Sequence, residues 1–202
     1  MPGNCQSIHP KTQLPPLIRY ATQMNRPVLS LACWLLAAPV FAALKPGAPA
    51  PDFTTEASLA GQPFKFALAE ALKAGPVVLY FYPAAFTHGC TLEAHDFAEA
   101  TDQFKALGAT VIGVSHDSID TLNKFSVSEC RNKFAVASDA DQKISKAYDA
   151  VLLMTSYSSR TSYVIAPDGK ILYAYSALNP DKHVANTMAA VAKWQAEQKK
   201  GS

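Results

Sequence analysis

A buried strand, a short loop and an amphipathic helix constrain the fold of this chain most strongly. The run Val77–Tyr82 is continuously apolar, which is typical of a strand buried on both faces of a sheet. A helical pattern covers about Thr91–Leu107 after the loop, and a second apolar run follows at Thr110–Ser115. Gly108 ends the helix. Together these segments predict a βαβ unit built around the loop.

The pattern of the central helix separates an inward face from a solvated face. Its buried stripe is expected to consist of Ala94, Phe97, Phe104 and Leu107. The acidic residues are expected to face water, and they are Glu93, Asp96, Glu99 and Asp102.

The remaining segments extend this unit into an α/β domain. Strands are expected at 134–137, 161–166 and 170–175, the last two joined as a hairpin through Pro167-Asp168-Gly169. Further helices are expected at 68–73, at 142–148, at 182–193, and from a Ser118 cap to about residue 133. The order β-α-β-α-β-α-β-β-α predicts a thioredoxin-like fold, a central mixed β-sheet flanked by helices on both faces.

The first 42 residues read as a leader rather than as part of the domain. A short basic start at Met24, an apolar stretch and the small-residue site Val40-Phe41-Ala42 are typical of a secretory signal peptide cleaved after Ala42. Residues 1–23 are then an N-terminal extension, with Met24 as the true start. The alternative is an uncleaved N-terminal anchor. We expect an exported protein of the bacterial periplasm, with residues 43–202 forming a single domain.

The charge of the chain is concentrated in the leader. The whole sequence has 18 basic and 16 acidic residues, and Lys11, Arg19 and Arg26 all precede the expected cleavage site without any acid beside them. The mature part is therefore close to neutral. No basic stripe with interleaved aromatic residues remains in it, so the pattern does not indicate nucleic-acid binding.

Two of the four cysteines fall in the mature part. Cys5 and Cys33 lie in the leader, which leaves Cys90 and Cys130. In an oxidising compartment two such cysteines are expected to pair or to be used chemically. Cys90 lies where a strand turns into a helix, and the unpaired N–H groups of a helix start favour thiolate over thiol. The alternative is that Cys90 is a small buried residue.

The loop before Cys90 resembles that of the peroxiredoxins. Their pattern Pro-x-x-x-Thr/Ser-x-x-Cys is filled here by Pro83, Thr87 and Cys90, after a strand and before a helix. The stretch 86–94 is most similar to the bacterioferritin-comigratory (PrxQ) subgroup, and the resemblance extends over about residues 46–194. The run 160–165 also matches and supplies the family's arginine, Arg160.

The resemblance implies a role for each of these residues. Cys90 would attack the O–O bond of a hydroperoxide as a thiolate and become a sulfenic acid. The hydroxyl of Thr87 would lie beside the sulfur, and Arg160 would hold the thiolate and donate to the peroxide oxygens. Pro83 would shield the reacting atoms from water. Taken singly, Thr87 is also a helix cap, Arg160 a surface strand residue and Pro83 a turn residue.

The histidines and the glutamate near Cys90 give weaker evidence for a chemical role than the motif residues do. His88, Cys90 and His95 are too few for a structural metal site, so we expect neither a metal nor a cofactor. His95 and His116 are expected on the wetted surface. Glu93 is interpreted as a first-turn carboxylate favoured by the helix dipole, or alternatively as a residue that orients Arg160.

The chain departs from its subgroup at the resolving cysteine. Many members carry a second cysteine five residues after the first, and this chain has His95 at that position. We therefore expect Cys130, late in the helix after Ser118, to form a disulfide with Cys90 after turnover. The alternative is an inert buried Cys130, with an external thiol resolving the sulfenic acid.

The leading functional hypothesis is a thiol peroxidase recycled by a thioredoxin-like reductant and present as a monomer or weak dimer. A thiol–disulfide oxidoreductase on the same fold needs a Cys-x-x-Cys pair, and residue 93 is glutamate. A redox sensor that does not turn over is the other alternative, and it would use the same sulfur as a switch.

Overall fold

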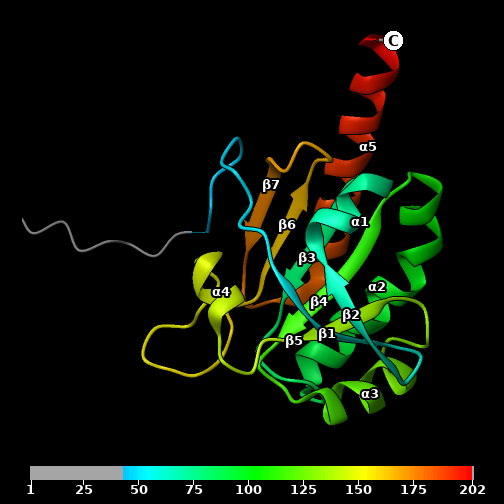
Figure 1. Ribbon diagram of the computed structural model, residues 1–202. Helices are drawn as coiled ribbons and strands as arrows, with labels where there is room; N and C mark the ends of the chain where they lie inside the picture. Colours follow the sequence, from blue (N-terminus) through cyan, green and yellow to red (C-terminus); the bar gives the residue numbers. More distant parts are fainter. Residues whose placement is uncertain (1–42, 202) are drawn as a thin grey trace, which may run out of the picture. The chain divides into compact units, whose positions relative to one another are not determined.

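The computed structural model describes residues 43–201, which contain one seven-stranded sheet in the order β2-β1-β5-β4-β3-β6-β7 (Figure 1). The expectations for residues 1–42 lie outside the described residues. The strands are β1 (Thr54–Leu59), β2 (Gln62–Ala67), β3 (Val77–Phe81), β4 (Thr110–Ser115), β5 (Ala135–Ser138), β6 (Thr161–Ile165) and β7 (Ile171–Ser176). The helices are α1 (Leu68–Ala74), α2 (His88–Ala106), α3 (Ile119–Ser128), α4 (Lys143–Ala147) and α5 (His183–Gly201), with a 3-10 turn, η1, at Pro180–Lys182.

Strand β3 lies near the middle of this sheet and is buried along its whole length. It pairs in parallel with β4 and antiparallel with β6, and β6 continues into β7 as the expected hairpin. Because successive side chains of a strand point to opposite faces, β3 contributes to two cores. Val78 and Tyr80 pack with α2, α3 and α5, and Val77 and Leu79 pack with α1 and α4. The predicted mixed sheet with helices on both faces is confirmed.

The hairpin of β1 and β2 was not expected from the sequence. Its strands are joined by Ala60 and Gly61, both with positive φ (51° and 76°), a backbone suited to a tight two-residue turn. Strand β1 also pairs antiparallel with β5, which places the hairpin at one edge of the sheet. Most of the β2 side chains are exposed, and its hydrophobic alternation is limited to Phe64-Lys65-Phe66, which is too short to indicate a strand.

Helix α3 is shorter than predicted, and this moves Cys130 out of it. The helix ends at Ser128, with Glu129 as its C-cap, and the N–H of Cys130 donates to the carbonyl of Phe125 (3.1 Å). Arg131 and Asn132 follow with φ of 51° and 59°, a left-handed conformation that cannot continue a helix. The prediction that Cys130 lies late in this helix is wrong: it lies in the turn that follows.

Helix α5 extends past the predicted 182–193 and runs to Gly201. Its last turns are rich in Ala, Glu, Gln and Lys, residues with high helix propensity, so the polar composition reflects exposure rather than disorder. Figure 1 shows the end of α5 projecting beyond the strands. Among residues 43–201, no helix has the length and hydrophobicity needed to span a membrane.

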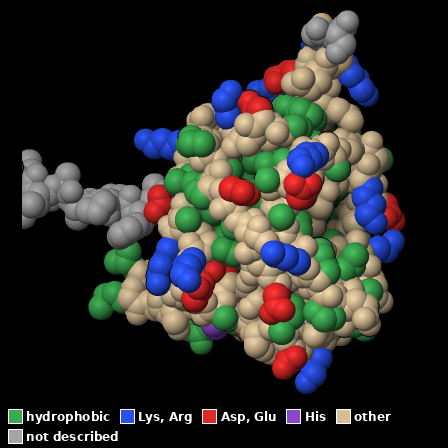
Figure 2. Space-filling model, in the orientation of Figure 1, with side chains coloured by type: hydrophobic (Ala, Val, Ile, Leu, Met, Phe, Trp, Pro, Cys, Tyr) green, Lys and Arg blue, Asp and Glu red, His purple; other side chains and the backbone are tan. Residues whose placement is uncertain are grey.

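Acidic and basic side chains are interspersed on the face drawn in Figure 2, without a large area of one sign. Some of these oppositely charged side chains form exposed ion pairs, such as Arg131–Glu99 (3.0 Å) and Lys133–Asp102 (3.0 Å). Because exposed pairs of this kind contribute about 0–1 kcal/mol each, the fold depends on its two apolar cores.

Candidate active site

Cys90 lies in the first turn of α2, directly after the loop that leaves β3. The helix begins at His88, three residues earlier than the pattern indicated, and Thr87 occupies the N-cap position. This places Cys90 among the N–H groups at the positive end of the helix dipole. Its side chain is only 1% exposed. Burial removes water from the sulfur, so any charge on it has to be balanced by neighbouring groups.

Arg160 is the cation next to this sulfur, and the sheet topology brings it there from 70 positions away. It directly precedes β6, which pairs with β3, the strand leading to Cys90. Its Nη2 donates to Cys90 Sγ at 3.5 Å, and its Nε donates to the carbonyl of Leu178 at 2.9 Å. The side chain is buried, so the alternative of a surface strand residue is wrong. A guanidinium fixed in this way favours a thiolate at Cys90.

Glycine at position 89 lets Arg160 approach the sulfur, a requirement that the sequence alone did not indicate. A Cβ built on Gly89 would lie 3.1 Å from Arg160 Nη2, closer than such atoms normally approach. The guanidinium cannot easily move away, because its Nε is bonded to the Leu178 carbonyl and its Nη1 to Glu93. The lack of a side chain at this position therefore belongs to the geometry of the site.

Glu93 is buried beneath Arg160, and the prediction that it faces water is wrong. Its exposure is 0%, and its Oε2 accepts a hydrogen bond from Arg160 Nη1. The alternative that Glu93 orients Arg160 agrees with this contact. Burial raises the pKa of Glu93 to about 8, against the opposing attraction of Arg160. The sequence signal was the spacing: Glu93 follows Cys90 by three residues and so shares its helix face.

Thr87 lies one turn before Cys90, with its hydroxyl directed to the backbone of the loop. Its Oγ1 donates to the carbonyl of Ala84 (3.0 Å), and the side chain forms no cap hydrogen bond with α2. The cap interpretation is therefore correct for the position of Thr87 and wrong for its side chain. Among the contacts of residues 43–201, none joins the hydroxyl to Cys90 Sγ.

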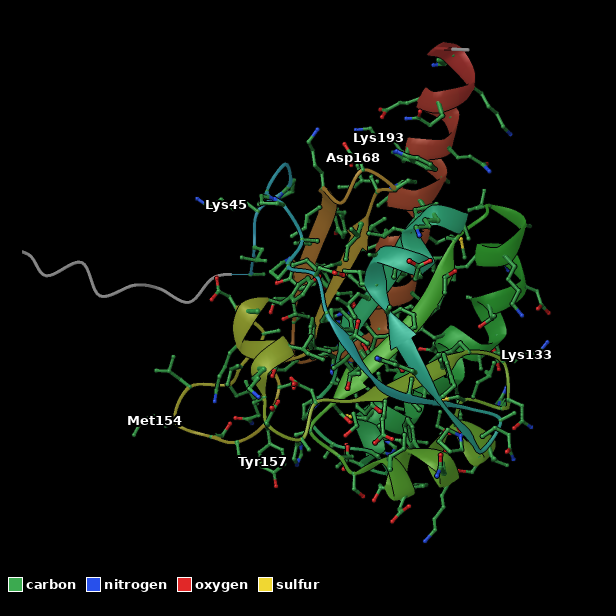
Figure 3. The ribbon with its side chains drawn as sticks, in the orientation of Figure 1. Lys45, Lys133, Met154, Tyr157, Asp168 and Lys193 are labelled. Carbon is green, nitrogen blue, oxygen red and sulfur yellow. The ribbon has the colours of Figure 1, made fainter. Side chains whose placement is uncertain are left out.

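The loop before α2 is fixed from the end of β4. The carbonyl of Pro83 accepts a hydrogen bond from His116 Nδ1 (3.0 Å), and the N–H of Ala85 donates to Asp117 Oδ2 (2.7 Å). The expectation that His116 lies on the wetted surface is met only in part, because the residue is half-buried and its ring contacts Tyr157 (4.9 Å between centroids). Tyr157 comes from the loop after α4, which also carries the exposed Met154 (Figure 3). His116 and Asp117 gave no sequence signal beyond following a buried strand.

The other two histidines of the motif region do not join the sulfur. His88 is exposed, and His95 is half-buried, with its Nε2 2.9 Å from Glu129 Oε2. Within residues 43–201 no group of three or more His, Cys, Asp or Glu side chains is arranged to hold a metal ion.

Cys130 is buried in the same apolar core as Cys90, and both are free thiols. Burial is the main cause that raises the pKa of the Cys130 thiol far above its ordinary value, and the charge of Glu129 adds to it. The aromatic side chains of Tyr80 and Tyr82 belong to this core as well. The structure thus places the two sulfurs in one cluster, and the disulfide between them stays a prediction.

The family of the chain follows from its similarity to known proteins. The model of the AhpC/TSA family matches residues 46–174. Chloroplastic peroxiredoxin Q of Oryza sativa subsp. japonica is 33% identical over 70% of this chain, which spans 64% of the length of the rice protein.

Two solved structures share the fold and part of the sequence. Peroxidoxin BcpB of Mycobacterium tuberculosis is 31% identical, covers 74% of this chain and 97% of its own, and has a TM-score of 0.65. The bacterioferritin comigratory protein of Xanthomonas campestris is 27% identical, with coverages of 69% and 91% and a TM-score of 0.62. The resemblance read from Pro83, Thr87 and Cys90 is thereby confirmed, and the chain belongs to the AhpC/TSA family of peroxiredoxins, with relatives named peroxiredoxin Q and Bcp.

Proposed function

We propose that this protein is a thiol-dependent peroxidase in which Cys90 reduces a hydroperoxide. The observation that carries the proposal is the 3.5 Å contact between Arg160 Nη2 and Cys90 Sγ at the start of a helix. Membership of the peroxiredoxin family supports it. The sulfur is buried next to a fixed cation, an arrangement that favours a nucleophilic thiolate.

The proposed reaction is a displacement at one peroxide oxygen. The Cys90 thiolate forms an S–O bond as the O–O bond breaks, which oxidises the sulfur to a sulfenic acid and reduces the peroxide. The leaving oxygen departs with the electron pair of the O–O bond and takes up a proton to become water or an alcohol. Arg160 donates to the sulfur in the ground state and is placed to stabilise the charge that develops on the oxygens.

Thr87 and Pro83 complete the proposed site from the loop. For the hydroxyl of Thr87 to reach a bound peroxide, it exchanges its present bond with the Ala84 carbonyl for one with the substrate. Thr87 is exposed and Pro83 is half-buried, so the loop forms the boundary between the buried sulfur and solvent. In this position the apolar ring of Pro83 limits the access of water to the reacting atoms.

The substrate class is a hydroperoxide, and the co-substrate is a thioredoxin-like reductant or another thiol. The bacterioferritin comigratory protein of Xanthomonas campestris has alkyl peroxide reduction activity, and we infer that organic hydroperoxides as well as hydrogen peroxide are substrates here. We further propose export to the periplasm, from the leader pattern of residues 24–42. A role in antioxidant defence follows from this chemistry, and the protein acts as a monomer or weak dimer.

We propose Cys130 as the cysteine that resolves the sulfenic acid. Its thiol and that of Cys90 belong to the same apolar core, on one side of the sheet. A disulfide requires Cα atoms within about 7 Å, so the first turn of α2 is expected to unwind when it forms. Thiolate formation at Cys130 also needs this opening, because burial keeps its thiol protonated in the closed state.

Peroxide consumption by the wild type and by two serine variants tests the proposal. With thioredoxin, thioredoxin reductase and NADPH, the wild type should turn over repeatedly, and Cys90→Ser should be inactive. Cys130→Ser should consume one equivalent of peroxide and lose recycling by thioredoxin. A wild type that stops after one equivalent with every thiol supplied would indicate a redox sensor. The resolving role of Cys130 fails if peroxide-treated protein, digested without reductant, yields no linked Cys90–Cys130 peptide in mass spectrometry.

A further inference from the structure

A buried histidine lies behind the Cys90–Arg160 pair, and the proposed peroxidase reaction does not use it. His183 is the first residue of α5 and is 0% exposed. Its Nδ1 lies 3.6 Å from Glu93 Oε1 and 2.8 Å from Ser162 Oγ, and its Nε2 lies 3.0 Å from the carbonyl oxygen of Ala177. A chain of polar groups therefore connects Cys90 through Arg160 and Glu93 to His183.

The hydrogen bonds determine where the histidine carries its proton. The carbonyl of Ala177 can only accept, so Nε2 of His183 must carry a hydrogen. In the neutral ring Nδ1 is then an acceptor, and the hydroxyl of Ser162 donates to it. An ionised Glu93 would direct a second acceptor, Oε1, towards the same nitrogen. Among the described residues Oε1 has no hydrogen-bond partner, although Glu93 is fully buried.

One additional proton between Glu93 Oε1 and His183 Nδ1 removes this conflict. On Nδ1 this proton faces both Ser162 Oγ at 2.8 Å and the unpartnered Oε1 at 3.6 Å, and on Oε1 it faces Nδ1 in place of the Ser162 hydroxyl. It also balances charge: with Cys90 as a thiolate and Glu93 ionised, the single cation Arg160 faces two buried anions. Burial raises the pKa of Glu93 to about 8 and lowers that of His183 to about 4, so the two groups together hold one proton, rather than two or none, at neutral pH.

We propose that Glu93 and His183 share one buried proton beneath Arg160, and that this proton leaves the charge of the arginine free to hold Cys90 as a thiolate. His183 acts through Glu93 and Arg160 without touching the sulfur, so it is a positioning residue. The inference deepens the proposed peroxidase and rests on it for its biological purpose.

Other titratable groups around the pair do not replace this role. The ring of Tyr175 on β7 contacts His183 edge-on, at 4.8 Å between centroids, which is a contact between rings rather than with a charge. Asp96, one turn along α2, is an exposed carboxylate, and Tyr80 of β3 is a buried phenol whose pKa is raised well above its ordinary value by burial. In the described part of the chain, Arg160 is the only cation in contact with Glu93, apart from a protonated His183.

The test measures alkylation of Cys90 by iodoacetamide as a function of pH, in the full-length chain, with the Cys90 peptide quantified by mass spectrometry. Two variants remove the proton site in different ways. His183→Gln retains an amide that can donate to the Ala177 carbonyl, and His183→Asn places an amide near the Nδ1 position. Neither amide takes up a proton. Both variants should shift the midpoint of the profile upward by about one pH unit, which slows alkylation about tenfold below the midpoint.

A merely structural role for His183 predicts a different result. If its bond to Ala177 were all that mattered, His183→Gln would retain the wild-type midpoint and only His183→Asn would shift, and this outcome would overturn the proposal. A wild-type midpoint in both folded variants would overturn it as well. His95→Gln, on the same helix as Cys90 but paired with Glu129, is the control and should match the wild type.

A second measurement needs no histidine variant and so remains decisive if those variants do not fold. Because coupling between two sites is reciprocal, Cys90 should affect the proton of the pair as much as the pair affects Cys90. The ¹⁵N shift of His183 Nδ1 should therefore titrate about one pH unit lower in Cys90→Ser than in the wild type. Equal midpoints in the two proteins would refute the shared proton. Neither experiment involves peroxide, so a wild type without peroxidase activity would defeat the proposed function and leave this result intact.

Discussion

The two cysteines of the described chain have the same burial and opposite surroundings. Cys90 and Cys130 are 1% and 0% exposed and belong to one apolar core. Cys90 lies in the first turn of a helix and accepts a hydrogen bond from Arg160, whereas Cys130 follows the end of a helix, with burial and Glu129 both opposing its ionisation. Burial alone makes a thiol inert, and a fixed cation with helix N–H groups reverses this at one of the two positions.

Removing the cation should have the largest effect on this contrast. Arg160→Met should lower the kcat/KM for peroxide by about 100- to 1000-fold, because a fixed donor to a developing charge is lost. Stopped-flow measurement of peroxide reduction provides the readout. Arg131→Met, which removes an exposed arginine paired with Glu99, is the matched control and should retain the wild-type rate. A variant at position 160 with more than half of the wild-type rate would contradict the assignment of Arg160.

Direct comparison of the two thiols should give the next largest effect. In the native reduced protein at pH 7, iodoacetamide should modify Cys90 about 100-fold faster than Cys130, since only the thiolate reacts and burial raises the pKa of Cys130. Quantifying both peptides by mass spectrometry over time gives the ratio in a single sample. The ratio of the two rates should fall towards unity in denaturant, because both thiols are then exposed to water and have the reactivity of an unfolded chain. Equal rates in the native protein would mean that Arg160 does not distinguish the two sulfurs.

The glutamate beneath Arg160 should make the stability of the protein depend on pH. Its pKa is raised to about 8 by burial, so between the unfolded value and pH 8 the folded state holds a proton that the unfolded state has lost. Stability therefore falls as pH rises through this window. His183, with its lowered pKa of about 4, has the opposite slope below about pH 6.5.

The net effect of Glu93 should appear between about pH 6.5 and 8, as a loss of about 2 kcal/mol in the free energy of unfolding. Urea titrations at several pH values measure it. Glu93→Gln should flatten the curve in this range, and Asp96→Asn, an exposed carboxylate on the same helix, should leave the slope unchanged. A wild-type curve that is flat across this range would show that Glu93 is ionised throughout.

The sequence predicted the parts of the site that depend on local order. Pro83, Thr87 and Cys90 are neighbours in the chain, and the strand before them and the helix after them follow from apolar patterns that the structure confirms. Arg160 was found through the family resemblance, because its approach to Cys90 depends on the pairing of β6 with β3. Local patterns contain no information on such a pairing.

The errors at the site share one physical cause, which is tertiary contact overriding a local preference. Glu93 has the polarity of a surface residue, and only a cation arriving from another strand explains its burial. His116 follows a buried strand. It helps to fix the loop before α2 only because the fold brings the Pro83 carbonyl, which follows the neighbouring strand, within hydrogen-bond distance of its ring. His183 lies at the start of a helix whose polar residues are mostly exposed, so nothing in its own segment predicts contact with α2.

The smallest predicted effect concerns the glycine that lets the arginine approach. Gly89→Ala should lower the kcat/KM for peroxide by about three- to tenfold, because the added methyl group presses on Arg160 Nη2 and displaces it from the sulfur.

Alanine is favoured over glycine inside a helix by up to about 1 kcal/mol, so the variant should not be less stable than the wild type. Activity would then fall without a loss of stability, which a general loss of folding cannot produce. His88→Ala, one position earlier and exposed, should share any gain in helix stability and retain the rate. If Gly89→Ala reacts as fast as the wild type, the guanidinium has room to adjust, and the contrast between the two cysteines needs only the charge of Arg160 and not its exact position.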